Sequence, residues 1–140
     1  MPIRLVDLEP SFVRHEVKIE TRKRVKADVA SSRPFGPYIE GDFESHTGPT
    51  EYRVHVDSLT EADGIVFLCP KCVNDSGHQV LCWFEDRVPE DVKPGPGRWW
   101  PVGTGYEDLT FAPHRKSNSV ALLGGCGAHF TLTNGVIEGV

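Results

Sequence analysis

Two matched pairs of residues constrain this chain more than any other feature of its sequence. They are Cys69-Pro70-Lys71-Cys72 and Cys126-Gly127-Ala128-His129, and in each pair two metal-binding residue types are separated by two positions. This spacing lets one tight turn direct two side chains at a single tetrahedral ion. We therefore predict a zinc site formed by Cys69, Cys72, Cys126 and His129.

The two pairs lie far apart in the sequence, with 53 residues between them. A shared ion would join distant segments, so the free energy of metal binding would also be free energy of folding. Four good ligands would fill a tetrahedral shell and leave no position at which zinc could activate water. The expected role of Zn²⁺ is therefore structural.

A second, local arrangement of ligands stays open. Cys69, Cys72, His78 and Cys82 lie within fourteen residues, close to the spacing of nucleic-acid zinc knuckles. The histidine is displaced by one position from that pattern, and Cys82 stands in an apolar stretch where a buried strand residue is expected. The long-range site is favoured on these grounds, although His78 or Cys82 could replace one of its members.

The length and composition predict one β-rich domain rich in turns. The chain has 140 residues, 14 glycines and 11 prolines. No apolar run approaches the length of about 20 residues that a membrane span requires, and no signal-peptide core follows Met1. We expect a soluble cytoplasmic protein without a membrane partner, in which a CxxC pair binds metal and does not form disulfides.

The first half of the chain predicts strands around an irregular segment. Apolar and polar residues alternate over residues 13–20 and again over 52–57, as in half-buried strands. Residues 31–50 contain several breakers and are expected to be irregular. Residues 65–68 and 79–84 can pair as an antiparallel hairpin that carries the first CxxC in its turn.

The second half predicts further short strands. Residues 89–105 hold many Pro and Gly around Trp99 and Trp100, which indicates an irregular loop anchored by buried indoles. Short strands at 119–123 and 130–133 flank the second pair, with Gly124, Gly125 and Gly127 suited to the turn between them. Asn134-Gly135 is typical of a two-residue hairpin turn. The expected fold is mainly β, with zinc-ribbon-like hairpins around a structural metal and at most one or two short helices.

Two other functions stay open as alternatives. Residues 1–35 carry eight basic and five acidic residues, and the run from Arg22 to Lys26 could contact the phosphates of a nucleic acid. Glu85, Asp86 or His78 could act as a general base beside an open metal, which would make the protein a metal-dependent hydrolase. The adjacent acids Glu107 and Asp108 are expected to shape a turn, and the chain has no HExxH, phosphate-binding loop or nucleophile elbow.

Several short motifs between residues 51 and 140 resemble an uncharacterised family of small bacterial and phage zinc-binding domains. The resemblance is carried by Leu68-Cys69-Pro70-Lys71-Cys72, Trp99, Asp108-Leu109-Thr110-Phe111-Ala112-Pro113, Ser119-Val120, Cys126-Gly127-Ala128-His129-Phe130 and Asn134-Gly135-Val136-Ile137. The chain departs from the family pattern over residues 113–119, where a Pro-Ser pair is usual. The resemblance implies a β-rich domain with the same metal shell at Cys69, Cys72, Cys126 and His129.

The family has no established activity, and some members are encoded beside ubiquitin-like conjugation components, which implies an accessory or adaptor role. We therefore expect a single zinc-stabilised domain over 1–140, with a core at 51–140 and an N-terminal strand and irregular extension at 1–50. The partner is expected to be another protein. The chain is not expected to be an enzyme.

Overall fold

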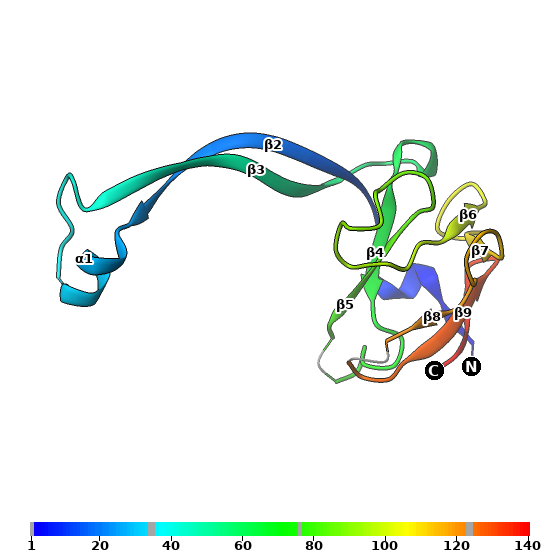
Figure 1. The fold of residues 1–140 in the computed structure, drawn as a ribbon. Coiled ribbons are helices and arrows are strands. Elements are labelled where there is room, and N and C mark those ends of the chain that lie inside the picture. The colour runs from blue at the N-terminus through cyan, green and yellow to red at the C-terminus, as the bar shows by residue number, and fades with distance from the viewer. Residues whose placement is uncertain (1, 34–35, 76, 123–124) are drawn as a thin grey trace. The chain divides into compact units, whose positions relative to one another are not determined.

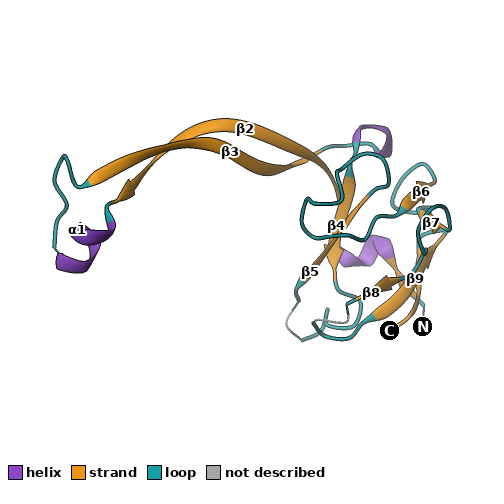
Figure 2. Ribbon diagram, in the orientation of Figure 1, coloured by secondary structure: helices purple, strands orange, loops and turns teal. Residues whose placement is uncertain are grey.

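The computed structural model describes residues 2–33, 36–75, 77–122 and 125–140, so Gly124 of the expected turn lies outside the described residues. The mainly β fold is confirmed (Figure 2). The strands are β1 (Ile3–Arg4), β2 (Ser11–Val25), β3 (Phe43–His55), β4 (Gly64–Leu68), β5 (Gln79–Trp83), β6 (Trp100–Val102), β7 (Thr110–Ala112), β8 (Val120–Ala121), β9 (His129–Thr133) and β10 (Val136–Gly139). The helices are α1 (Ala27–Ser32) and the single-turn 3₁₀ helices η1 (Leu5–Leu8) and η2 (Leu59–Glu61).

The chain divides into two compact units (Figure 1). Residues 1–15 and 53–140 form the core unit, and residues 16–52 form the ribbon unit. One sheet has the strand order β1-β10-β9-β8, a second has the order β3-β2-β4-β5, and β6 pairs with β7 alone. The core unit therefore combines strands from three sheets.

The expected hairpin of β4 and β5 is confirmed. The two strands are antiparallel, with Leu68 opposite Gln79 and Gly64 opposite Trp83. Gly64 is required here, because a Cβ atom at this position would lie 2.6 Å from the Trp83 ring and 2.7 Å from the Cys82 carbonyl oxygen. The close approach of the two strands is thus set by a residue without a side chain.

The Asn134-Gly135 turn between β9 and β10 is also confirmed. The φ angles of Asn134 and Gly135 are 50° and 74°, and both positive values are those of a type I′ turn. A Cβ atom on Gly135 would lie 2.3 Å from the carbonyl oxygen of Glu107. The turn therefore fixes the hairpin register and at the same time packs against the loop before β7.

The main hydrophobic core lies between the sheets of the core unit, and a smaller cluster of Val13, Val66, Trp83, Val88 and Val92 accompanies it. The rings of Phe67 in β4 and Phe130 in β9 meet edge to face with centroids 6.0 Å apart. Leu5, Leu8 and Phe12 are buried in the same core, and β1 pairs with β10. The first residues of the chain, which we expected in the N-terminal extension, thus belong to the core unit.

The ribbon unit is a two-stranded antiparallel ribbon with α1 in the connection between its strands (Figure 1). The expectation that all of residues 31–50 are irregular is wrong, because residues 43–50 form the first part of β3. Hydrogen bonds join the two sides of the ribbon. The Thr21 and Thr47 hydroxyls are 2.7 Å apart, and Lys26 N–H, just after β2, donates to the carbonyl oxygen of Asp42, just before β3, at 2.8 Å. Pro49 is tolerated because β3 is an edge strand, with β2 as its one neighbour among the described strands.

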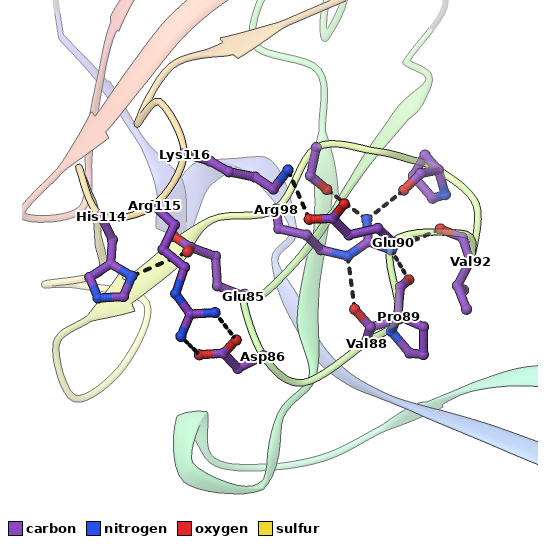
Figure 3. A network of polar contacts seen from close by, with 12 residues as sticks. Glu85, Asp86, Val88, Pro89, Glu90, Val92, Arg98, His114, Arg115 and Lys116 are labelled. Carbon is purple, nitrogen blue, oxygen red and sulfur yellow. Dashed lines mark hydrogen bonds and ion pairs between the residues drawn. The ribbon is translucent and has the colours of Figure 1, made fainter.

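The loop that follows β5 is organised by one buried guanidinium group (Figure 3). Arg98 is only 2% exposed. Its five N–H groups donate to five backbone carbonyl oxygens, those of Val88, Pro89, Val92, Pro94 and Gly97. Burial lowers the pKa of Arg98, while the carboxylates of Glu90 and Asp91 act in the opposite direction. Arg98 thus supplies the hydrogen bonds that a loop without regular structure would otherwise lack.

We predict that Arg98→Met lowers the free energy of unfolding by about 3 kcal/mol, because it leaves several buried carbonyl groups without a donor. Arg115→Met is the control, since the Arg115 side chain is 64% exposed and forms a surface ion pair with Asp86. It should change the free energy by less than about 1 kcal/mol. Urea denaturation measures both, and equal effects of the two substitutions would contradict the role of Arg98.

Candidate metal centre

The structure brings three cysteines and one histidine together in the core unit. One ligand atom from each of Cys69, Cys72, His78 and Cys126 lies within 4.8 Å of the others. Cys69 directly follows β4, Cys72 lies in the turn after it, and His78 directly precedes β5. Cys126 comes from the turn between β8 and β9. The group therefore joins the hairpin of one sheet to a turn of another.

The spacing of the sulfur atoms fits a metal ion better than a disulfide. The Sγ atoms of Cys69 and Cys126 are 3.7 Å apart. Two thiolates bound to zinc at about 2.3 Å with a tetrahedral angle would be about 3.8 Å apart, whereas a disulfide requires about 2.05 Å. All four cysteines are free thiols in the structure.

His78 offers a nitrogen atom that suits metal binding. Its Nε2 atom is buried and has no hydrogen-bond partner among the described residues. Buried polar nitrogen atoms are rarely left without a partner, and neutral imidazole is a common zinc ligand. The chemistry of the donor set, three sulfur atoms and one nitrogen, thus fits Zn²⁺.

The histidine of this group is His78 and not the expected His129. His129 is the first residue of β9, where its side chain is exposed while the next residue, Phe130, is buried. Strand alternation therefore turns His129 toward solvent. In contrast, the β4–β5 register places His78 opposite Cys69, and the Cys69 N–H donates to the His78 carbonyl oxygen at 2.8 Å.

This difference could have been found in the sequence. The alternation of Phe130 and Leu132 as core residues already implies that His129 points outward. Extending the expected hairpin by one pair beyond Leu68 and Gln79 brings His78 opposite Cys69. The structure thus combines Cys126 of the long-range site with His78 of the local one.

Cys82, the other member of the local arrangement, lies outside this group. It is fully buried in β5, and this burial raises the pKa of its thiol. A protonated thiol in an apolar environment behaves as a small hydrophobic side chain.

The turn around Cys126 stabilises a thiolate. The backbone N–H of Ala128 lowers the pKa of Cys126 to about 6, and the side chains of His78 and the neighbouring cysteines act in the same direction. The Lys71 ammonium group donates to the carbonyl oxygen of Cys126 at 3.0 Å. Burial raises the pKa of Cys72 to about 11, and the adjacent thiols add to this effect. The lowered pKa of Cys126 therefore favours its thiolate at neutral pH in the absence of metal, whereas the raised pKa of Cys72 favours its thiol.

The other candidate residues have structural partners. Asp108 accepts hydrogen bonds from the backbone N–H groups of Thr104 and Gly105, both at 2.9 Å, which lower its pKa and shape the turn as expected. Trp99 packs against the core, and its indole N–H donates to the Ser119 carbonyl oxygen at 3.1 Å. Trp100 stacks on the ring of His114, with centroids 4.1 Å apart.

Comparison with known proteins gives no relative for this chain. No protein-family model matches it, no curated protein is significantly similar to it, and no solved structure gives a significant match. Among the described residues, no helix has the length and apolar character needed to cross a membrane. The family resemblance therefore stays an expectation. The group of three cysteines and one histidine defines the site as a candidate metal centre.

We predict that Cys126 is the cysteine that reacts first with iodoacetamide in chelator-treated protein at pH 7. Its lowered pKa keeps the thiol deprotonated above about pH 6, so the rate should be near its plateau at pH 7 and fall below pH 6. Mass spectrometry of peptides after short exposures measures the rate at each cysteine. Cys82 should remain unmodified while the protein is folded.

Urea-unfolded protein is the control, because all four thiols should then react with the ordinary pKa of about 8.5. The same ordinary pKa for Cys126 in the folded, chelated protein would contradict the prediction.

Proposed function

We propose that this chain is a zinc-binding protein in which Cys69, Cys72, His78 and Cys126 form a closed structural site. The observation that carries the proposal is the convergence of the four ligand atoms within 4.8 Å of one another. Four ligands would complete the tetrahedral shell of Zn²⁺. The ion would crosslink the β4–β5 hairpin to the turn before β9, and this crosslink is the chemistry that we assign to it.

The biological role that we propose is that of an accessory or protein-interaction module, of bacterial or phage origin as the family resemblance implies. Support for an interaction role comes from the ribbon unit. Five of the seven large hydrophobic side chains that are exposed in the described part of the chain lie in this unit, namely Val17, Ile19, Tyr38, Ile39 and Phe43. Exposed apolar side chains that gather in one segment are typical of surfaces that bind another protein.

The ribbon unit is less suited to binding nucleic acid. Arg22 of the basic run lies 3.3 Å from the carboxylate of Glu20 and also donates to the Tyr52 hydroxyl. Acidic residues elsewhere in the unit, such as Glu40 and Glu44, oppose attraction to phosphates. The ribbon therefore supports a protein partner better than a polyanion.

We predict that the purified protein contains one zinc ion per chain, and that His78→Ala and Cys126→Ser each lose it. Loss of one ligand from a tetrahedral shell should weaken zinc binding by at least about tenfold. It should also lower the midpoint temperature of unfolding, because metal binding is linked to folding. Metal analysis after dialysis against a weak chelator measures the content.

The matched controls are His129→Ala and Cys82→Ser, which should both retain zinc. Loss of zinc from His129→Ala and retention of zinc by His78→Ala would support the site first predicted from the sequence, in which His129 is the fourth ligand. The cobalt-substituted protein should show the intense visible absorption of a four-coordinate site with three sulfur ligands. A five- or six-coordinate spectrum would favour an open, hydrolytic metal over a structural one.

We predict that the ribbon variant Val17→Ser/Ile19→Ser loses proteins that the wild type captures from a bacterial lysate, because it removes apolar surface from the ribbon. The side chains of Val17 and Ile19 are 51% and 70% exposed, so the fold and the zinc content should not change. Val102→Ser is the control, since Val102 is 48% exposed but lies in β6 of the core unit. Equal capture by all three proteins would contradict an interaction role of the ribbon.

A further inference from the structure

A cavity of about 500 Å³ lies in the core unit beside the loop that Arg98 organises. Its lining comes from the segment after β5 and from the segment after β7, and includes Glu85, Glu90, Arg98, Arg115 and Lys116. Glu85 differs from the other acidic residues of the lining, Asp86 and Glu90, because it is only 4% exposed. Cavities with a few buried polar groups are the usual sites at which proteins bind small ligands.

The carboxylate of Glu85 is held in place but is only half satisfied. The Glu85 backbone N–H donates to the Trp99 carbonyl oxygen at 2.8 Å, which fixes the residue beside the bridge between Phe84 and Trp99. Oε1 lies 3.2 Å from Nδ1 of His114 (Figure 3). The His114 ring is itself held by stacking on Trp100. Oε2 is buried and has no hydrogen-bond partner among the described residues.

In contrast, the cationic groups of the lining have acceptors already. Arg115 makes two hydrogen bonds to Asp86, at 2.6 and 2.7 Å, and the Lys116 ammonium group lies 2.9 Å from Glu90 (Figure 3). Arg98 donates all its N–H groups to carbonyl oxygens, as described above, and Arg87 donates to the carbonyl oxygens of Leu59 and Ala62. Each cationic side chain of the lining therefore has at least one acceptor in the described structure, whereas Oε2 of Glu85 has no donor.

We propose that this cavity binds the cationic end of a ligand, an alkylammonium or guanidinium group that donates a hydrogen bond to Oε2 of Glu85. A buried carboxylate oxygen without a donor is costly, and a cationic donor compensates that cost more fully than a neutral one. The group could belong to a free small amine or to a Lys or Arg side chain of a polypeptide. The site lies apart from the metal centre in its residues, and the proposal does not depend on zinc.

The test is an NMR titration of the zinc-loaded full chain with four probes of similar size: n-butylammonium, N-butylguanidinium, butyrate and 1-butanol. The two cations should give saturable shifts at the Glu85 amide and at the Arg98 Nε–H, while butyrate and butanol should not. Glu85→Gln should weaken cation binding by about tenfold or more, because it removes a charged acceptor. Glu107→Gln, an exposed carboxylate outside this cavity, should bind as the wild type does.

A second pair of variants keeps the test valid if Glu85→Gln does not fold. Glu90→Trp should cover the cavity and abolish binding, whereas Glu90→Gln should retain it, and both lose the exposed ion pair with Lys116. Acetyl-Gly-Lys-Gly-amide identifies the source of the cation. Binding tighter than that of n-butylammonium indicates a polypeptide side chain, and equal or weaker binding indicates a small amine.

Three results would overturn the proposal. They are binding of butyrate in place of the cations, cation binding that Glu85→Gln leaves unchanged, and no saturable shift with any cation up to about 10 mM, the range of weak single-contact ligands. Zinc content is measured on the same samples. Failure of cation binding can then be told apart from failure of the proposed zinc site.

Discussion

The meeting of three thiols and one imidazole between two sheets is the contact on which the core unit depends. Cys69 and His78 close one end of the β4–β5 hairpin, and Cys126 approaches from the turn before β9. The adjacent Phe67 and Phe130 rings join the same two sheets by apolar packing. A short chain with many turns buries limited apolar surface, so a metal ion held by these four residues would add stability beyond that of packing.

The sequence predicts those elements whose signals are local. Alternation predicted strands over residues 13–20 and 52–57, which lie within β2 and mostly within β3, and Asn134-Gly135 identified the β9–β10 turn with its two positive φ angles. The cysteines of the site followed from spacing alone. The histidine required a second step, because the choice between His78 and His129 depends on strand register and on which face of β9 is buried.

Other features depend on contacts that no local pattern reveals. Residues 43–50 contain Gly48 and Pro49 and have little strand propensity, yet they form part of β3 because β2 offers a complete hydrogen-bonding edge. The sequence marks Glu85 only as a candidate general base after a strand and does not indicate that it is buried. Its burial follows from the packing of two distant segments around it, one of which carries His114.

Arg98 holds the loop through five backbone carbonyl groups. These hydrogen bonds do not depend on the side chains of the residues that supply the carbonyl groups. The loop is therefore free to vary in sequence wherever a side chain faces solvent, provided that the backbone path is kept. Arg98 has no such freedom, since lysine offers three N–H donors where arginine offers five. Evolution of this segment should accordingly leave one nearly invariant arginine beside a stretch of changing residues, and this arginine would be a structural residue even though its conservation resembles that of a catalytic one.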